Sequence, residues 1–211
     1  MKKSPFVITI SRQLGSGGAY IGLQLARKLN FAYIDREIIS EAAKKLSVVE
    51  EDLENRDEKK LSFWQSFLYG YWAPDSYIPP QIYVPTDREL YNAEAQIIQH
   101  IANERSAVII GRCGSHILRD NKNHASIFLH AGMDFRKQRV KELYNVPDEA
   151  ALKMITQSDY QRGQYHRKVT GTDWTDLKQY DLSINIEKVG IDNSIEFILK
   201  YISCFENGTN I

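Results

Sequence analysis

The feature that most constrains the fold is the stretch at residues 7–35, which reads VITISRQLGSGGAYIGLQLARKLNFAYID. A β-branched, apolar run at 6–10 predicts a buried strand, and a glycine-rich turn follows at 15–18. Ile21, Leu25 and Leu29 then recur at helical spacing, and a second apolar run at 31–35 predicts another strand. Because strands alternate with helices, this stretch predicts a parallel sheet in an α/β fold.

The glycine-rich turn also predicts an anion site. Glycine allows backbone N–H groups to turn inward around an anion, and the N-terminus of the following helix favours negative charge. A plain glycine-rich turn is the alternative, but the strand before it and the helix after it favour phosphate binding.

The rest of the chain continues the alternation of strands and helices. Apolar runs predict strands at 107–110, 126–130 and 182–186, and helical periodicity predicts helices at 38–46, 86–104, 134–144, 148–168 and 191–202. The expected architecture is a five-stranded parallel sheet with helices on both faces. In such a fold, ligands bind at the carboxyl ends of the strands.

The alternation is interrupted before residue 86. Residues 47–60 are highly charged, which predicts a surface helix or loop, whereas 61–85 are rich in aromatic residues and contain four of the six prolines. The second segment therefore reads as an irregular insertion. Its aromatic side chains either stack on a nucleobase or pack in the core or at an interface, including that of a possible homodimer.

Composition excludes several partners. The 211 residues carry a formal net charge of zero, which gives no electrostatic reason to expect nucleic-acid or membrane binding. No apolar run approaches the ~18 residues needed to cross a bilayer. Cys113 and Cys204 form no paired motif, so we expect a reducing, cytoplasmic location. The five histidines show no metal-ligand spacing, and we expect no protein-bound metal site.

Charged residues follow the expected strands at the edge where ligands bind. Asp35 and Arg36 follow the second strand, where Asp35 is equally well explained as a helix cap. Arg112 lies between two glycines after the third strand, which suits close approach to a phosphate, although a surface arginine in a tight turn gives the same pattern.

Two later helices are rich in arginine. Arg136 and Arg139 lie on the first, and Asp159, Arg162 and His166 share one face of the second. A salt-bridged solvent face is the usual reason for such spacing. Residues 160–168 contain no carboxylate, however, which favours a site for an anion.

Several of these motifs together resemble nucleoside monophosphate kinases, most closely the cytidylate kinase-like family of P-loop proteins. The resemblance covers nearly the whole chain and rests on ITISRQLGSGGAYIG, YIDREII, IIGRCG, SIFLHAGMDFRKQRV and YDLSINIEKVG, in that order. It implies a P-loop NTPase-like, three-layer α/β/α fold in a single domain, 1–211. Within it, 47–104 would be an acceptor-binding insertion and 145–172 a lid-like helical segment.

The resemblance also implies transfer of the γ-phosphoryl group of ATP, with Mg²⁺, to a nucleoside monophosphate such as CMP. By position, the donor phosphates would be held by Gly15, Ser16, Gly17, Gly18 and Ala19. The acceptor nucleotide would be held by Asp35, Arg36 and Arg112. The lid would contribute Asp159, Arg162 and Arg167 to catalysis, and the donor nucleotide would lie near Arg136 and Arg139.

The loop departs from the usual Walker pattern at two positions. Gly18 stands where active kinases carry lysine, and Ala19 stands where many carry a hydroxyl. The first change removes a cation from the phosphates, and the second removes the usual protein ligand of Mg²⁺. Arg12 is the only other cation in the loop, and we expect it to take part in catalysis, with Ser11 or Ser16 reaching the metal.

Three interpretations of function remain. The retained lid arginines favour an active phosphotransferase, because a pure sensor needs no cations at the reaction stage. The missing lysine and hydroxyl favour a degenerate kinase that binds nucleotide as a sensor or regulatory module without turnover. The divergent insertion allows a third reading, a kinase that acts on a different small acceptor.

Overall fold

The computed structural model describes residues 4–35, 39, 42–43 and 87–207. The chain divides into two compact units, one formed by residues 1–36 and 99–211 and the other by 37–98. Arg36, the charged stretch and the aromatic, proline-rich segment lie outside the described residues. The sheet and the site described below belong to the first unit.

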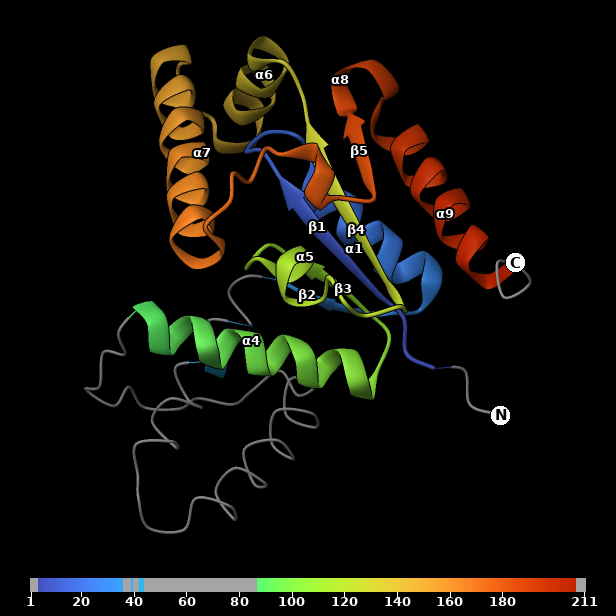
Figure 1. The fold of residues 1–211 in the computed structure, drawn as a ribbon. Helices are drawn as coiled ribbons and strands as arrows, with labels where there is room; N and C mark the ends of the chain where they lie inside the picture. Colours follow the sequence, from blue (N-terminus) through green and yellow to red (C-terminus); the bar gives the residue numbers. More distant parts are fainter. Residues whose placement is uncertain (1–3, 36–38, 40–41, 44–86, 208–211) are drawn as a thin grey trace, which may run out of the picture. The chain divides into compact units, whose positions relative to one another are not determined.

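A five-stranded parallel sheet forms the centre of this unit, as predicted (Figure 1). Its order is β2-β3-β1-β4-β5, and every neighbouring pair is parallel. The strands are β1 (Val7–Arg12), β2 (Ala32–Ile34), β3 (Ala107–Ile110), β4 (His124–His130) and β5 (Leu182–Asn185). The chain visits β2 and β3 on one side of β1 and then β4 and β5 on the other. The order in which the chain adds strands therefore reverses beside β1. Ligands of α/β folds bind at such a switch point.

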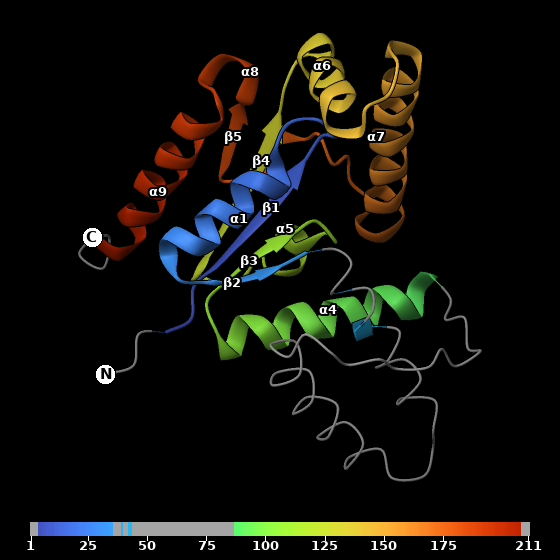
Figure 2. The same ribbon diagram turned by 180° about the vertical axis from the view of Figure 1, so that it is seen from behind.

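Two amphipathic helices cover one face of the sheet, α1 (Gly18–Leu29) and α9 (Ile191–Asn207) (Figure 2). Their apolar stripes pack on alternate residues of the strands in one buried cluster, which includes Ile8, Ile10, Ile21, Leu25, Ile127, Leu129, Ile195 and Ile198. Phe128 lies between two members of this cluster, so it points to the opposite face. There its ring packs against the rings of Trp174 and Tyr180, at 5.7 and 5.0 Å between centroids.

The remaining helices are α4 (Asp87–Glu104), α5 (Gly114–Ile117), α6 (Met133–Tyr144), α7 (Asp148–Thr170), the 3-10 turn η1 (Leu177–Gln179) and α8 (Ile186–Val189). The predictions for α4, α6 and α7 are confirmed to within two residues. The prediction that the fifth strand reaches residue 186 is wrong, because the Asn185 side chain accepts a hydrogen bond from Lys188 N and starts α8. Among the described helices, none combines the length and apolar character that a membrane span requires.

Helices α6 and α7 lie side by side and form a hairpin next to the glycine-rich loop (Figure 1). Val140, Ala151 and Ile155 make a small buried cluster between them. Leu14, a residue of the loop, packs against that cluster. This contact fixes the loop against the hairpin and brings the basic residues of α7 toward the end of β1.

Candidate functional site

Hydrogen bonds to β4 and to the residue that follows it hold the glycine-rich loop between β1 and α1 in place. Gln13 N donates to Leu129 O at 3.0 Å, and Ala131 N donates to Gln13 Oε1 at 3.3 Å, which ties the loop to β4. Ser16 is fully buried, and its hydroxyl donates to Gln13 O at 2.8 Å. These contacts fix the shape of the loop through its side chains and through the backbone N–H groups of Gln13 and Ser16. The N–H groups in the first turn of α1 have no acceptor within that helix, so they are the groups suited to meet a ligand.

Glycine is required at position 15 of this loop. Gly15 adopts a φ of +86°, and a methyl group there would lie 2.8 Å from Arg136 O. The loop therefore passes directly over the first turn of α6. Gly17 caps α1, and a methyl group on it would lie 3.6 Å from Arg139 Nη2, so the Arg139 guanidinium lies beside the loop.

Asp159 on α7 connects the loop to both basic helices. Its Oδ1 accepts from Leu14 N at 3.1 Å, and its Oδ2 accepts from Arg136 Nη1 at 2.5 Å. Arg162 Nη1 lies 3.7 Å from Oδ1. The Arg136 side chain is only 6% exposed, so this ion pair is largely removed from water and ties α6, α7 and the loop together.

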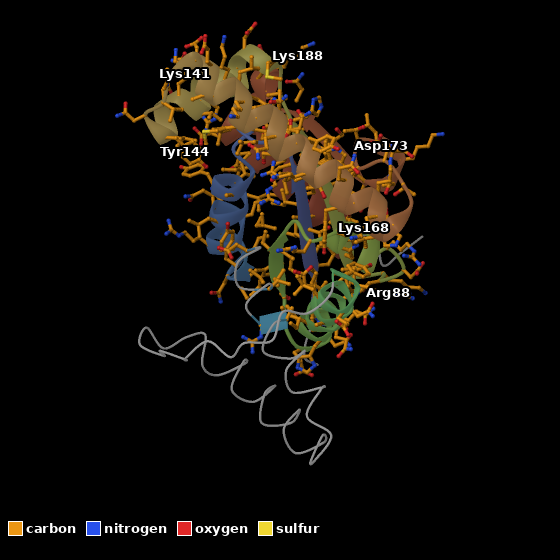
Figure 3. All side chains as sticks on the ribbon, turned by 90° about the vertical axis from the view of Figure 1, so that its left-hand side faces the viewer. Arg88, Lys141, Tyr144, Lys168, Asp173 and Lys188 are labelled. Carbon is orange, nitrogen blue, oxygen red and sulfur yellow. The ribbon has the colours of Figure 1, made fainter. Side chains whose placement is uncertain are left out.

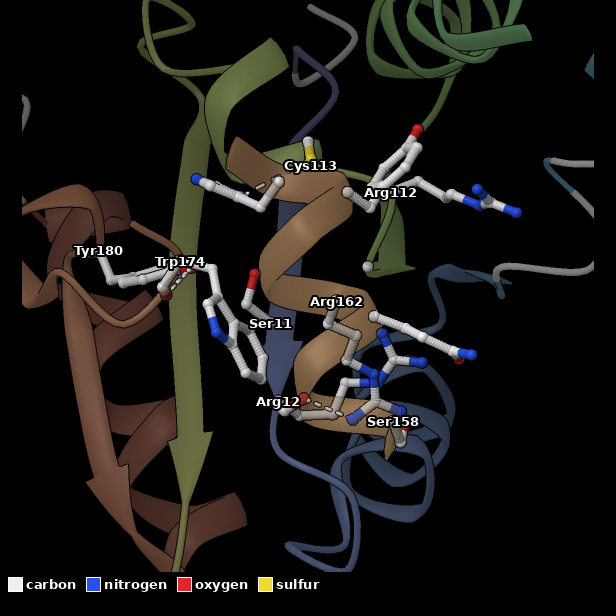
Figure 4. Close-up of a pocket in the computed structure, with 12 residues that line it drawn as sticks. Ser11, Arg12, Arg112, Cys113, Ser158, Arg162, Trp174 and Tyr180 are labelled. Atoms are coloured by element: carbon white, nitrogen blue, oxygen red, sulfur yellow. Dashed lines mark hydrogen bonds between the residues drawn. The ribbon is translucent and has the colours of Figure 1, made fainter. Parts of the chain in front are cut away.

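A cavity of about 230 Å³ opens at the carboxyl ends of β1 and β3 (Figure 4). Three arginines line it, namely Arg12 at the end of β1, Arg112 after β3 and Arg162 on α7. Its walls also carry the hydroxyl of Ser11 and the rings of Tyr165, Trp174 and Tyr180. Among the described residues that line it, none is an aspartate or glutamate. The cavity is therefore suited to an anion with a flat, partly apolar body.

The turn after β3 adopts an unusual backbone conformation. Gly111, Arg112 and Cys113 have φ angles of 79°, 53° and 53°, so three successive residues are left-handed. The two that are not glycine each cost about 1–2 kcal/mol in this conformation. The turn aims Arg112 along the cavity wall, where its guanidinium carbon lies 5.3 Å from the centre of the Tyr165 ring.

A chain of polar contacts fixes His166 in the same wall. Gln179 Nε2 donates to Asp173 O, which leaves Gln179 Oε1 to accept from His166 Nε2 at 3.1 Å. The other ring nitrogen, Nδ1, then faces Cys113 Sγ at 3.6 Å. Burial lowers the pKa of His166, the Gln179 hydrogen bond opposes this, and the neutral ring accepts from the thiol.

The structure brings together only part of the predicted site. Arg12, Arg112 and Arg162 meet in the cavity, although they lie far apart in sequence. Arg139 lies at the loop, whereas Arg136 is engaged in the buried ion pair. The side chain of Arg167, on α7, is 66% exposed and pairs with Asp173 at 3.3 Å. Asp173 lies on the outer surface (Figure 3).

Other predicted positions do not line the cavity. Asp35 follows β2 and is partly exposed, and Ala19 lies exposed in the first turn of α1. No sequence motif points to Tyr165, Trp174 or Tyr180, which also line the cavity. Trp174 and Tyr180 follow α7 in an irregular segment without periodicity, so only their contacts with Phe128 reveal their place.

The model of the cytidylate kinase-like family matches residues 7–188. The chain belongs to the cytidylate kinase-like family. The match covers the loop, the arginine-lined cavity and the α6–α7 hairpin, and it confirms the resemblance inferred from the sequence motifs.

Solved structures share the fold of this chain. An uncharacterized protein from Eubacterium ventriosum is 28% identical, with a TM-score of 0.71 over 94% of this chain and 98% of that one. A Thermus thermophilus protein is 15% identical, with a TM-score of 0.50 over 96% and 98%. A shikimate kinase from Bacteroides thetaiotaomicron is 16% identical, with a TM-score of 0.49 over 94% and 98%. No curated protein matches the sequence. The Eubacterium ventriosum match shows a fold that is shared along nearly the whole of both chains.

Proposed function

We propose that the protein is an ATP-dependent phosphotransferase that transfers the γ-phosphoryl group of ATP to a nucleoside monophosphate such as CMP. The observation that carries this proposal is the acid-free cavity that opens beside the glycine-rich loop and gathers three arginines. Phosphoryl transfer depends mainly on positioning and on neutralising charge at the transferred group. Cations from a strand, a turn and a helix that converge on one space are suited to that task.

In this proposal, the donor lies along the loop. The backbone of residues 15–19 and the N-terminus of α1 hold its phosphates, because both present N–H groups to an anion. Arg139 adds a cation beside Gly17. Arg136 and Asp159 hold the helical hairpin against the loop through their ion pair and have no direct contact with the nucleotide.

The acceptor occupies the cavity. Arg112 and Arg162 bind its phosphate, and the rings of Tyr165 and Trp174 pack against its flat part. Residues 145–172 act as the lid, residues 47–104 as the acceptor-binding insertion, and Asp35 and Arg36 assist from the end of β2. Arg167 contributes only if lid closure separates it from Asp173.

Magnesium fits this site as an ion brought by the nucleotide. Mg²⁺ in kinases is held largely by phosphate oxygens and water. Of the candidate hydroxyls, Ser16 is buried and donates to Gln13 O, whereas Ser11 lines the cavity. Ser11 Oγ is therefore the side-chain ligand that we assign to Mg²⁺, which supplies further positive charge to the phosphates when bound.

A nucleotide sensor without turnover is the alternative function. The observation that favours it is the loop itself, since Gly18 supplies no cation and Ala19 no hydroxyl. A kinase for another small acceptor is the third possibility, because the cavity selects for charge more clearly than for a base.

An assay of ADP release from Mg·ATP separates these functions. We expect turnover with at least one of CMP, UMP, dCMP and AMP. Silence across this panel, together with a thermal shift caused by Mg·ATP, would identify a sensor, because a ligand that binds only the folded state raises its stability. Turnover with a non-nucleotide acceptor alone would identify the third function.

Two further properties are part of the proposal. We propose a cytoplasmic location, where reduced thiols suit the two free cysteines. We also propose that the chain forms a homodimer, and a sizing column with light scattering would report its mass directly.

A further inference from the structure

We propose that Arg12 is the catalytic cation of the loop, and that residue 18 is glycine because the Arg12 side chain lies over it. The inference rests on the proposed phosphotransferase function, which it extends to a specific residue. On this view the cation has changed position. Arg12, at the end of β1, supplies the positive charge that lysine supplies at the position of Gly18 in other kinases.

The first observation is the contact at position 18. Gly18 is buried at the first position of α1, and a methyl group on it would lie 2.7 Å from Arg12 Cγ and 2.8 Å from Arg12 Cβ. Distances below 3.0 Å essentially never occur for a real Cβ. Any side chain at position 18, including lysine, therefore collides with the stem of Arg12.

The stem of Arg12 has little freedom to avoid this contact. Cβ and Cγ are the two side-chain carbons nearest the backbone, so they move little unless the backbone moves. Arg12 is the last residue of β1, and its backbone lies in register with Leu129 of β4. Arg162 Nη1 also donates to Arg12 O at 2.9 Å. Relief would require a new rotamer of Arg12, because its main chain is held on both sides.

The far end of Arg12 reaches the opposite side of the site. A methyl group added at Gly111 would overlap Arg12 Nη1. The side chain therefore runs from Gly18, beside the donor loop, to Gly111 at the end of β3, and it lines the cavity along the way (Figure 4). Small residues stand at both ends of this path, where larger side chains would block it.

This path places a guanidinium between the donor phosphates and the acceptor cavity. In the reaction, the bond between the γ-phosphorus and the β,γ-bridging oxygen breaks, and a bond from an acceptor phosphate oxygen to that phosphorus forms. ADP leaves with the electron pair of the broken bond. Arg12 remains protonated throughout and donates N–H groups to the oxygens of the transferred group, since arginine does not deprotonate in proteins.

Turnover tests the charge of Arg12. Arg12→Gln keeps Cβ and Cγ but removes the cation, and we expect it to lower kcat by about 100-fold or more, with Arg12→Lys recovering at least tenfold. Arg119→Gln removes an exposed arginine outside the site and should stay within about twofold of the wild type. An Arg12→Gln variant within threefold of the wild type would overturn the inference.

A stability cycle tests the packing without any activity. Gly18→Ala should lower Tm by several degrees in the wild type, because the methyl group meets the Arg12 stem. In an Arg12→Gly background, which removes both Cβ and Cγ, the same change should be neutral or raise Tm, since alanine is the better helix residue. Equal losses in the two backgrounds would contradict the inference.

An exchange of positions completes the test. Gly18→Lys alone should lower turnover, whereas Gly18→Lys with Arg12→Gly, which removes Cβ and Cγ, should exceed Arg12→Gly alone by about tenfold or more. A gain in turnover from Gly18→Lys alone would contradict the exchange.

The two proposals fail separately. If the wild type binds Mg·ATP but turns over no acceptor, the phosphotransferase fails. Arg12 is then judged by affinity, which Arg12→Gln should weaken about tenfold; an unchanged Kd overturns its role. If the wild type binds no nucleotide, both proposals are overturned.

Discussion

The two ends of the parallel sheet are built for different purposes. At the amino end of β4, His124 Nε2 lies 2.7 Å from Thr9 Oγ1, and Ser126 donates to Asp181 Oδ2 through both its N–H and its hydroxyl, at 2.7 Å each. At the carboxyl ends of β1 and β3, three arginines line a cavity without an acidic neighbour in its wall. At the amino end, short polar side chains are hydrogen-bonded to one another. At the carboxyl end, side chains of the same charge line one cavity.

The backbone shows the same difference. His124 and Ser126 are buried in regular strand. Arg112 and Cys113 are left-handed, whereas the other described left-handed residues that are not glycine are both asparagines at helix ends, Asn30 and Asn145. Asparagine tolerates this conformation and arginine does not favour it. Among the described residues, the left-handed residues that are neither glycine nor asparagine thus lie at the carboxyl end of the sheet, beside the arginine-lined cavity.

The sharpest way to break this comparison is to remove Asp159, which anchors the carboxyl end. We expect Asp159→Ala to lower the free energy of unfolding by about 4 kcal/mol, because it leaves the buried Arg136 guanidinium without its ion pair. Urea denaturation measures the change. Asp159→Ala with Arg136→Leu should recover most of the loss, and Asp120→Ala, an exposed control, should have little effect.

The pH dependence of stability tests the amino end of the sheet through His124. Burial lowers the pKa of His124 to about 4 from 6.5. Between these values the unfolded chain takes up a proton that the folded chain excludes, so the free energy of unfolding falls by up to about 3 kcal/mol as the pH drops from 6.5 to 4. His124→Gln should remove this share of the pH dependence in urea titrations at fixed pH. An identical slope in the variant would show that other groups cause it.

Arg162→Gln distinguishes function from stability at the carboxyl end. We expect kcat to fall about 100-fold, equivalent to about 2.7 kcal/mol of transition-state stabilisation, with a loss of only about 1 kcal/mol in unfolding from the bond to Arg12 O. Turnover and urea denaturation on the same preparation give both numbers. A larger effect on folding than on kcat would make Arg162 a structural residue.

Ser126→Ala should give the smallest effect. In contrast to Arg162→Gln, it should lower stability and leave turnover unchanged. It removes the hydroxyl that donates to Asp181 Oδ2 and accepts from Asp181 N. The hydrogen bond from Ser126 N to Asp181 Oδ2 and that from Asp181 N to Ser126 O remain, so we expect the free energy of unfolding to fall by only about 1 kcal/mol. Turnover should remain within about twofold of the wild type. Any large change in kcat would show that the two ends are coupled through β4.

The sequence predicts the sheet well because its strands are short apolar runs that no other element resembles. It also singles out Arg12, Arg112 and Arg162, since each follows a strand or shares a helical face. It cannot predict that Arg12 covers Gly18, because that contact depends on the rotamer of one residue and the packing of another. The contact between Cys113 and His166 joins residues 53 apart and has no periodic signal.

The left-handed turn at Arg112 and Cys113 has a consequence for evolution in the laboratory. Replacing either residue by glycine would relieve about 1 kcal/mol of backbone strain. A selection for heat resistance alone would therefore favour glycine there, at the expense of the guanidinium or the thiol. Variants from such a selection would have a higher Tm but a lower turnover. Position 112 would be the first at which stability and activity conflict.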